Sequence, residues 1–289
     1  MNVGTQYKLD DEFKAKARLF QSTYRSEVLE VEYQDYGNRL TDSDAEALLN
    51  YYSKLNSRDV LRQRYPNYSR KRDADLLRSE HIPFNLLAPL NTDRETAVKI
   101  ISEVWNISCV EIQAIEIEYA PSPKDNYLND GTAFDTYLKI MLANGNTCGI
   151  GIEVKYTEQA YPIGKTESVN VNDHNSLYWR TARASGVFRN SDDRAFGSDE
   201  FRQIWRNHLL GLRMIQAGDV DEFYSITLFP NGNSHFNHVI PEYISRLQDE
   251  AKPYLIGCTF EKFISAIQGT VEFEEWKQWL DQRYIIKDI

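Results

Sequence analysis

Two runs of alternating apolar and polar residues, joined by a short turn, constrain the fold of this chain most strongly. The first run covers residues 134–142 and the second covers residues 149–156, with Asn144-Gly145 between them. A period of two is typical of a β-strand that buries one face, and Asn-Gly is a frequent turn sequence. The two runs therefore predict a β-hairpin with one face against the core.

The face of the predicted hairpin that points away from the core carries charge. Asp135 lies on this face of the first strand, and Glu153 and Lys155 lie on it in the second strand. Carboxylate oxygens are the ligands that Mg²⁺ prefers, and a neighbouring cation stabilises an attacked phosphate. The pattern suits metal-assisted phosphodiester hydrolysis. The alternative is a solvent-exposed strand face with an ordinary Glu–Lys pair.

The length of the turn decides whether Asp135 shares that face. Directly opposed residues of an antiparallel pair point to the same side of the sheet. A two-residue turn at Asn144-Gly145 would place Asp135 opposite Val154, on the core side. The site therefore requires an odd-length loop, such as Asn144-Gly145-Asn146, or a β-bulge.

Length and composition limit the class of protein. The chain has 289 residues, of which 42% are hydrophobic, enough for one large domain with a substantial core. Its three cysteines are far apart, which favours buried thiols in a reducing compartment. No apolar leader or membrane-length segment is present in residues 1–16 or beyond. We therefore expect a cytoplasmic protein without membrane contact.

The net charge of −10 argues against general coating of nucleic acid, because such binding relies on positive charge. A negative net charge is still compatible with a local basic cleft. Two stretches rich in basic residues, 62–78 and 178–194, are candidates for a phosphate-binding track, and ordinary solvated surface is the alternative for both.

The remaining pattern predicts an order of helix, three strands, helix and strand. The expected elements of this core are a helix at 93–105, a strand at 110–119, the hairpin, a helix at 201–217 and a strand at 223–229. Outside the core we expect helices at 11–29, 43–55 and about 73–80, and two at 260–268 and 272–283. Residues 120–131 and 157–200 look irregular. Such an order is typical of a mixed α/β sandwich.

Asp135 followed eighteen positions later by Glu153-Val154-Lys155, on adjacent strands, resembles the motif of the PD-(D/E)XK nuclease superfamily. Phe134 stands where that family usually has proline, which is not a metal ligand. The chain also resembles a bacterial group of nuclease-like proteins of unknown role in that superfamily. The stretches that carry this second resemblance are 79–87, 131–135, 151–156, 203–210 and 228–233.

The resemblance implies a restriction-endonuclease-like α/β fold, with an αβββαβ core and a mixed central sheet flanked by helices. Extra helices would precede and follow this core. We expect a single domain over residues 1–289, with an N-terminal helical elaboration at 1–75, the nuclease-like core at 76–232 and C-terminal helices at 233–289.

The resemblance also implies roles for particular residues. Asp135, Glu153, the Val154 carbonyl and Glu80 would bind Mg²⁺ or Mn²⁺, with Glu118 competing with Glu80 as the third carboxylate. Lys155 would orient water or stabilise the anionic transition state, and we favour the second role because nearby carboxylates keep the lysine charged.

On the helix at 201–217, Gln203 and Arg206 are expected to face the substrate, and Asn207 lies on the same side. The apolar stripe of that helix includes His208, which is expected to be a core histidine.

The implied partner is nucleic acid, with DNA favoured over RNA. A homodimer and a partner subunit both stay open, as does a catalytically silent binding module on a nuclease fold. The activity expected from the intact Asp, Glu and Lys set is metal-dependent cleavage of phosphodiester bonds.

Overall fold

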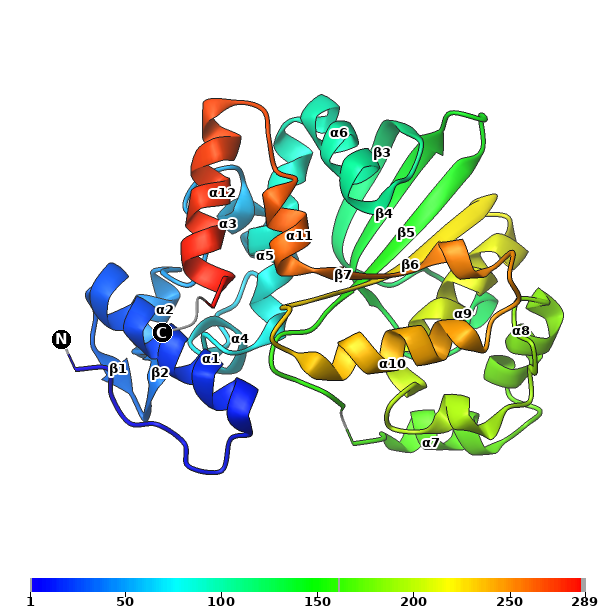
Figure 1. Cartoon of the computed structure of the whole chain (residues 1–289), viewed down its shortest axis with the longest axis horizontal. Coiled ribbons are helices and arrows are strands. Elements are labelled where there is room, and N and C mark those ends of the chain that lie inside the picture. The colour runs from blue at the N-terminus through cyan, green and yellow to red at the C-terminus, as the bar shows by residue number, and fades with distance from the viewer. Residues whose placement is uncertain (1, 161, 287–289) are drawn as a thin grey trace.

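A mixed five-stranded sheet forms the centre of the molecule in the computed structural model, which describes residues 2–160 and 162–286 (Figure 1). The strand order is β3-β4-β5-β6-β7, with β3, β4 and β5 antiparallel and β5, β6 and β7 parallel. These strands are β3 (Cys109–Tyr119), β4 (Phe134–Leu142), β5 (Thr147–Val154), β6 (Glu222–Phe229) and β7 (Leu255–Thr259). The predicted α/β class and mixed sheet are therefore confirmed.

The register of β4 and β5 confirms the predicted hairpin. Thr136 pairs with Ile152, and Lys139 pairs with Gly149. The Leu142 N–H donates to the Asn146 carbonyl at 2.9 Å, so residues 143–145 form an odd-length loop. This loop begins one residue earlier than the predicted Asn144-Gly145-Asn146. One further step of the register sets residue 135 against residue 153, as the site requires.

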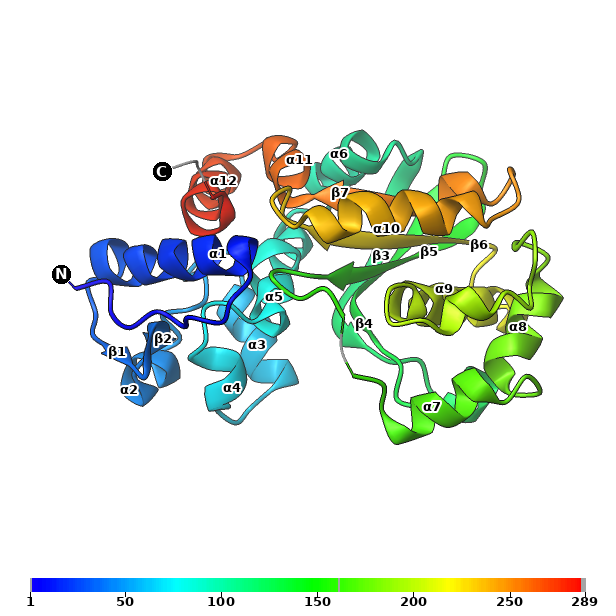
Figure 2. The ribbon, with the colours of Figure 1, turned by 60° about the horizontal axis from the view of Figure 1, so that its bottom comes forward.

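Helices cover both faces of the sheet, and Figure 2 shows α6 and α11 on one side with α8 and α9 on the other. One hydrophobic cluster joins the first face to α5 (Ile82–Leu86), α6 (Arg94–Trp105), α11 (Phe260–Ser265) and α12 (Val271–Tyr284). A second cluster joins the other face to α8 (Leu177–Ser185), α9 (Arg202–Ala217) and α10 (Ser234–Ser245). Burying each large apolar side chain contributes roughly 1.5–3 kcal/mol, so these clusters fix α9 firmly over the sheet.

A buried ring and three glycines set the close approach of α9 to the sheet. A Cβ atom on Gly149 would lie 2.7 Å from the Phe223 ring, and one on Gly151 would lie 2.8 Å from it. On the helix side, a Cβ atom on Gly211 would lie 2.7 Å from Phe223 Cγ. Only residues without a side chain fit around this ring. The face of β4 and β5 that carries the charged motif is thus the face under α9.

The elements predicted for the core are confirmed with small shifts at their ends. Asp93 caps α6 by accepting a hydrogen bond from the Thr96 N–H at 3.0 Å. Gly218 ends α9 with a left-handed φ of +80°, which suits glycine. The order α6, β3, β4, β5, α9, β6 is the expected αβββαβ core.

The part of the chain before the core contains more than the predicted helices. It consists of α1 (Glu12–Thr23) with a π-helical turn at Tyr24–Val28, β1 (Tyr33–Gln34), β2 (Tyr36–Leu40), α2 (Asp42–Glu46), α3 (Ser57–Arg64) and α4 (Arg70–Asp73). We call residues 2–75 the N-terminal lobe. The helix predicted at 43–55 is wrong, because α2 ends at Glu46 and Leu48 takes a left-handed φ of +61°.

The helix predicted at about 73–80 is also wrong. The Leu40 N–H donates to the Ala74 carbonyl and the Leu76 N–H donates to the Asn38 carbonyl, so this segment pairs with β2. Its backbone hydrogen bonds are therefore used in a β-like contact, and a 3₁₀ turn follows at Ser79–His81.

Two further segments differ from expectation. Residues 157–200 are not irregular throughout, because they contain α7 (Lys165–Asn172) and α8. Of these two helices, α8 buries Tyr178, Trp179 and Ala182, whereas α7 buries no residue. The segment 233–289, predicted as helices alone, contains the fifth strand β7 between α10 and α11. β7 has five residues, too few to show a period along the sequence.

No helix within residues 2–160 and 162–286 is both long enough and apolar enough to cross a membrane.

Candidate active site

The three motif residues lie at one end of the face that α9 covers. Asp135 is the second residue of β4, Glu153 is the last but one of β5, and Lys155 follows β5 directly. Lys155 Nζ lies 2.5 Å from Glu153 Oε1, and their side chains are 4% and 18% exposed. An ion pair this enclosed has lost most of its hydration, so its charges act strongly on their neighbours. It is therefore not the solvated strand pair that the sequence left as an alternative.

Asp135 is held by the backbone of the neighbouring strand. Its Oδ2 accepts a hydrogen bond from the Val154 N–H at 2.6 Å. Burial raises the pKa of Asp135 well above its ordinary value, and the charge of Glu153 raises it further. Among the described residues none donates a hydrogen bond to Asp135 Oδ1. That oxygen can serve an added cation, which would also relieve the repulsion between the two carboxylates.

Glu153 is held by a residue of α9. Asn207 Nδ2 donates to Glu153 Oε2 at 2.5 Å, while Lys155 occupies Oε1. Both oxygens of this carboxylate are thus oriented by protein donors. The sequence placed Asn207 on the site side of its helix, and the helical spacing from Gln203 was the only signal for it. Its contact with Glu153 could not be predicted from the sequence, because that contact depends on how closely α9 approaches the sheet.

Glu118 and Glu80 are the two candidates for a third carboxylate beside Asp135 and Glu153. The structure places them differently. Glu118 is the last but one residue of β3 and has a left-handed φ of +57°. Burial raises the pKa of Glu118, and the charges of Glu153 and Glu80 add to the effect. Its charge also raises the pKa of Asp135. A left-handed conformation is uncommon for a residue other than glycine and often marks a functional position.

Glu80 lies farther out than the sequence suggested. It sits on the 3₁₀ turn, with its side chain 41% exposed, and pairs with Arg78 at 3.2 Å and Lys71 at 3.8 Å. Within the described residues these two cations are its ion-pair partners. It influences Glu118 but is not brought into contact with Asp135 or Glu153, so its predicted role as a metal ligand stays a prediction.

A further carboxylate, Glu158, interacts electrostatically with Lys155. Its oxygens accept hydrogen bonds from the Tyr156 N–H at 2.9 Å and the Ser79 hydroxyl at 2.8 Å. Burial alone would raise the pKa of Glu158, but the charge of Lys155 and these donors outweigh it and lower the pKa. Glu158 therefore remains ionised beside Lys155 and ties the motif to the turn at Ser79–His81.

Of the two residues expected to face the substrate, Arg206 is close enough to the site for the charge of Glu153 to affect its pKa. Its guanidinium pairs with Glu167 of α7 at 3.2 Å. Burial lowers the pKa of Arg206, but the charges of Tyr178, Glu167, Asp130 and Glu153 together raise it above its ordinary value. Gln203 lies partly buried on the first turn of α9. Contact of either residue with a substrate stays a prediction.

The donor set fits a hard divalent cation with few protein ligands. No group of three His, Cys, Asp or Glu side chains in residues 2–160 and 162–286 is arranged to hold a metal ion alone. Mg²⁺ commonly keeps several waters and uses only one or two carboxylates. Asp135, Glu153 and the Val154 carbonyl are the residues that could hold it.

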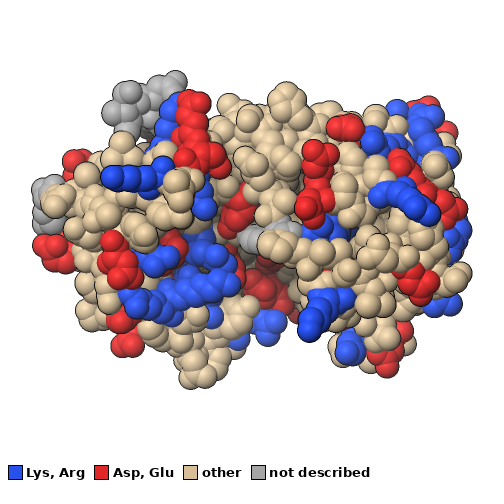
Figure 3. Space-filling model, turned by 90° about the horizontal axis from the view of Figure 1, so that it is seen from below, with Lys and Arg blue, Asp and Glu red and all other residues tan. Residues whose placement is uncertain are grey.

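Seen from below, the surface is hollowed beside the N-terminal lobe (Figure 3). Acidic side chains line the bottom of the hollow, and Lys and Arg side chains gather on the N-terminal lobe beside it. A polyanion could reach the buried acidic cluster along this basic flank, provided that a cation neutralises the carboxylates.

Comparison with known proteins gives one match. A family model described as PD-(D/E)XK nuclease superfamily matches residues 8–286. Neither the curated proteins nor the solved structures with which the chain was compared contain a significant match.

Proposed function

Because the chain belongs to the PD-(D/E)XK nuclease superfamily, we propose that it hydrolyses phosphodiester bonds of nucleic acid with Mg²⁺ or Mn²⁺ held at Asp135 and Glu153. The observation that carries the proposal is the geometry of the motif. Asp135 and Glu153 share one enclosed face of the hairpin, burial and the charge of Glu153 raise the pKa of Asp135, and Lys155 Nζ lies 2.5 Å from Glu153 Oε1.

Each residue of the site has a defined task in this proposal. Asp135 is oriented through Oδ2 by the Val154 N–H and presents Oδ1 to the cation. Asn207 and Lys155 fix the two oxygens of Glu153. A bound divalent cation would supply Lewis acidity toward the phosphoryl oxygen and would acidify the attacking water.

Lys155 acts as an electrostatic group in this mechanism. Its ammonium pairs with the carboxylate of Glu153 and interacts electrostatically with that of Glu158, and both carboxylates favour the charged form. A charged lysine stabilises the negative charge that develops on the phosphoryl oxygens during attack. A fixed cation in an enclosed site needs little reorganisation, so its effect on the barrier is large.

The substrate and surroundings follow by inference. DNA is the favoured nucleic acid, on the basis of the superfamily alone. All three cysteines are buried and unpaired, which is consistent with a cytoplasmic location. The chain could act as a homodimer or with a partner subunit, and these assemblies are distinguished by the mass of the active species in solution.

A cleavage assay with several DNA and RNA substrates, with and without Mg²⁺ or Mn²⁺, tests the proposal. Asp135→Asn and Lys155→Ala should each lose activity by about 10²–10³ or more, the scale of removing one charge-stabilising group. Asp125→Asn and Lys124→Ala, on an exposed loop, are the matched controls and should cleave like wild type. Wild-type rates in the Asp135 or Lys155 variant would overturn the assignment.

A catalytically silent module is the second candidate, because Glu153 is already engaged by two protein donors. Calorimetric titration with Mn²⁺ separates the two. Saturable binding that Asp135→Asn abolishes supports the nuclease, and saturable binding without cleavage by the isolated chain supports a subunit that needs its partner. Absence of saturable binding supports the silent module.

A further inference from the structure

We propose that a cleft beside the N-terminal lobe, lined by Lys14, Arg39 and Arg78, binds a second phosphate of the nucleic-acid strand that is cleaved at Lys155. This inference rests on the proposed function and adds a binding site outside the motif. The site lies where the N-terminal lobe meets the segment that follows β5.

The cleft has a volume of about 280 Å³ and runs between the N-terminal lobe and the segment that follows β5. The side chains that the argument uses are those of Tyr7, Lys14, Arg39, Arg78, Thr157 and Glu158. Thr157 lies two residues after Lys155, so their Cα atoms are at most about 7 Å apart. Each strand of a DNA duplex carries one phosphate per about 3.4 Å of helix axis, so a phosphate one or two nucleotides from the scissile one falls within this reach. A strand at Lys155 can therefore place a neighbouring phosphate in the cleft.

The carboxylates that also line the cleft are engaged by other donors. Asp10 pairs with Arg18 at 2.5 Å, and its side chain is 2% exposed. Asp75 accepts hydrogen bonds from Asn38 at 2.6 Å and the Leu77 N–H at 3.1 Å. Glu158 is bound by Ser79 and Tyr156, as described above. The negative charge of the cleft is thus largely compensated within the protein.

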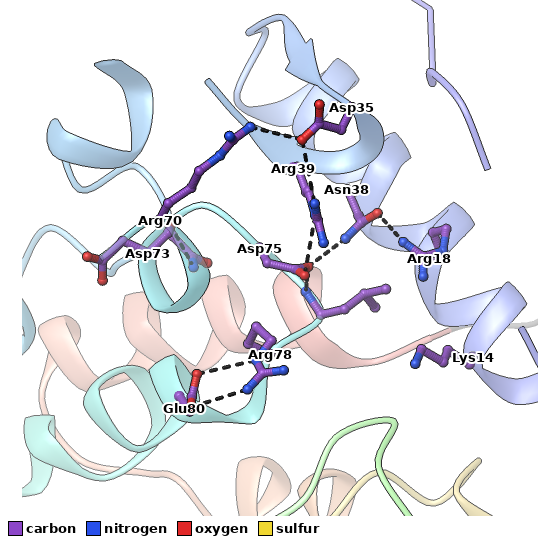
Figure 4. A network of polar contacts seen from close by, with 12 residues as sticks. Lys14, Arg18, Asp35, Asn38, Arg39, Arg70, Asp73, Asp75, Arg78 and Glu80 are labelled. Atoms are coloured by element: carbon purple, nitrogen blue, oxygen red, sulfur yellow. Dashed lines mark hydrogen bonds and ion pairs between the residues drawn. The ribbon is translucent and has the colours of Figure 1, made fainter. Parts of the chain in front are cut away.

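Of the four cations that line the cleft, Arg18 is paired with Asp10 and Arg78 with Glu80, whereas Lys14 and Arg39 are loosely held (Figure 4). Arg39 lies 3.5 Å from both Asp35 and Asp75, and its buried Nε forms no hydrogen bond with any described residue. Lys14 Nζ lies 4.0 Å from Asp10. Their side chains are 37% and 40% exposed, so either can turn toward an anion without breaking a short hydrogen bond.

Arg78 connects the cleft to the active site. Its guanidinium pairs with Glu80 at 3.2 Å, and the next residue, Ser79, donates to Glu158. Figure 3 shows the basic flank of the N-terminal lobe running up to the acidic hollow. A phosphate in the cleft would lie beside Arg78, at the end of the cleft that is nearer to the active site.

The cleft also offers an aromatic wall. The rings of Tyr7 and Tyr36 meet edge to face with centroids 5.8 Å apart, and Tyr7 is 42% exposed. A base or sugar beside the bound phosphate can pack on Tyr7, as bases do on aromatic side chains in single-strand binding sites. Cations with an adjacent aromatic surface favour a nucleic-acid strand over a free inorganic anion.

Equilibrium binding of a short fluorescent DNA, measured by anisotropy over about 50–200 mM salt with Ca²⁺ in place of Mg²⁺, tests the inference. Lys14→Ala/Arg39→Ala should bind about tenfold or more weakly. The slope of log K against log salt should fall by about 1.8 for duplex or 1.4 for single-stranded DNA. Lys16→Ala/Lys54→Ala removes two exposed cations of the same lobe and should leave affinity and slope unchanged.

Two milder variants separate the loss of charge from a possible loss of folding in the double variant. Lys14→Gln alone should lower the slope by about 0.9 on duplex DNA, and Arg39→Lys should retain most of the wild-type affinity. An unchanged slope in Lys14→Ala/Arg39→Ala and in Lys14→Gln overturns the inference. If cleavage still depends on Asp135 and Lys155 in that case, the proposed function survives, whereas a wild-type chain that neither binds nor cleaves nucleic acid removes both.

Comparing DNA with and without a 5′-phosphate identifies the source of the bound group. Equal loss of affinity on both substrates in the cleft variant assigns an internal backbone phosphate. A loss confined to the phosphorylated substrate assigns a terminal one. Either result supports the cleft as a phosphate site.

Discussion

Glu153 is held by two donors at once, and this makes Asn207 an informative residue in the site. Lys155 orients one carboxylate oxygen and Asn207 the other, each at 2.5 Å. Residues that hold metal ligands in place typically contribute 10–100-fold to metal affinity or activity. Asn207 would act as a positioning residue that sets the direction in which Glu153 presents its charge.

We expect Asn207→Ala to raise the Mg²⁺ concentration needed for half-maximal cleavage by about 10–100-fold. The activity at saturating Mg²⁺ should recover in part, because the carboxylate itself remains. The measurement is a Mg²⁺ titration of the cleavage rate, with Asn237→Ala on the exposed face of α10 as control. An Asn207→Ala protein with the Mg²⁺ dependence of wild type would contradict a positioning role.

The motif residues could be predicted from the sequence, whereas the residues that surround them could be predicted only in part. Alternation put Glu153 and Lys155 on one side of their strand, since a strand has a fixed period of two, and the odd-length loop was the added condition that brings Asp135 to the same side. The choice between Glu80 and Glu118 could not be made, because it depends on how the ends of β3 and the 3₁₀ turn lie in space. Asn207 reaches Glu153 only because three glycines let α9 come close to the sheet.

At the scale of elements, the contact of α9 with β5 and β6 reverses an ordinary expectation about glycine. Glycine inside a helix usually costs about 1 kcal/mol relative to alanine, so Gly211→Ala should stabilise an isolated helix. Here the added methyl would lie 2.7 Å from Phe223 Cγ. The ring cannot shift, because Gly149 and Gly151 enclose it from the sheet side.

We therefore expect Gly211→Ala to lower the free energy of unfolding by about 1–3 kcal/mol, as overpacked cores do. Urea denaturation measures this change. Gly131→Ala, at a position with no heavy atom within 4 Å of the added Cβ, is the control and should change stability by less than about 0.5 kcal/mol. A more stable Gly211→Ala protein would show that α9 can move away from the sheet.

The same helix gives a prediction about pH. His208 is buried, as its place on the apolar stripe predicted, and its Nδ1 lies 3.1 Å from the Tyr243 hydroxyl. Burial lowers the pKa of His208 to about 4. Between about pH 4 and pH 6.5 the unfolded chain binds the proton that the folded chain refuses, so stability falls as the pH falls through this window.

From these values, wild type should lose about 2 kcal/mol of stability through His208 between pH 7 and pH 5. His208→Gln, which cannot take up a proton in this range, should lose correspondingly less. Urea denaturation at both pH values measures the difference, with His238→Gln on the exposed side of α10 as control. Equal acid sensitivity in wild type and His208→Gln would refute the argument.

Which elements the sequence predicted depended on their length and on the origin of their hydrogen bonds. Long segments such as α6, α9 and β3 show a clear apolar period in the sequence, and this period predicts whether each is a helix or a strand. Residues 74–76 carry a helical pattern but hydrogen-bond to β2, and β7 has five residues whose pairing partner is β6. Pairing with distant strands overrides local propensity and is not visible in a local pattern.

At the scale of the whole molecule, a buried polar network joins the two ends of the described chain behind the active site. Gln21 of α1 donates to the Tyr156 hydroxyl at 2.6 Å and to the Arg283 carbonyl at 2.9 Å. Arg283 of α12 donates to Gln21 Oε1 and, at 2.8 Å, to Asn50 Oδ1. Tyr156 directly follows Lys155, so the network anchors the end of the motif.

Arg283 has an unusual position for a cation, because it is fully buried and its described hydrogen-bond partners are neutral. Its guanidinium carbon lies 5.0 Å from the centre of the Tyr24 ring and 4.7 Å from that of Tyr284. Neutral acceptors and ring faces together compensate for the lost hydration. The N-terminal lobe, the C-terminal helix and the core should therefore unfold as one unit.

We expect Arg283→Met to lower the free energy of unfolding by roughly 3 kcal/mol, because Gln21 Oε1 and Asn50 Oδ1 would stay buried without a donor, each at about 1–3 kcal/mol. The apolar side chain keeps most of the volume, so the loss reports on hydrogen bonding more than on a cavity. Urea denaturation followed by both Trp fluorescence and far-UV circular dichroism measures it, with Arg62→Met on exposed α3 as control. Coincident transitions at lower urea are the expected result. Unchanged stability would mean that the network fixes the arrangement of the chain ends without stabilising it, as some buried ionic groups do.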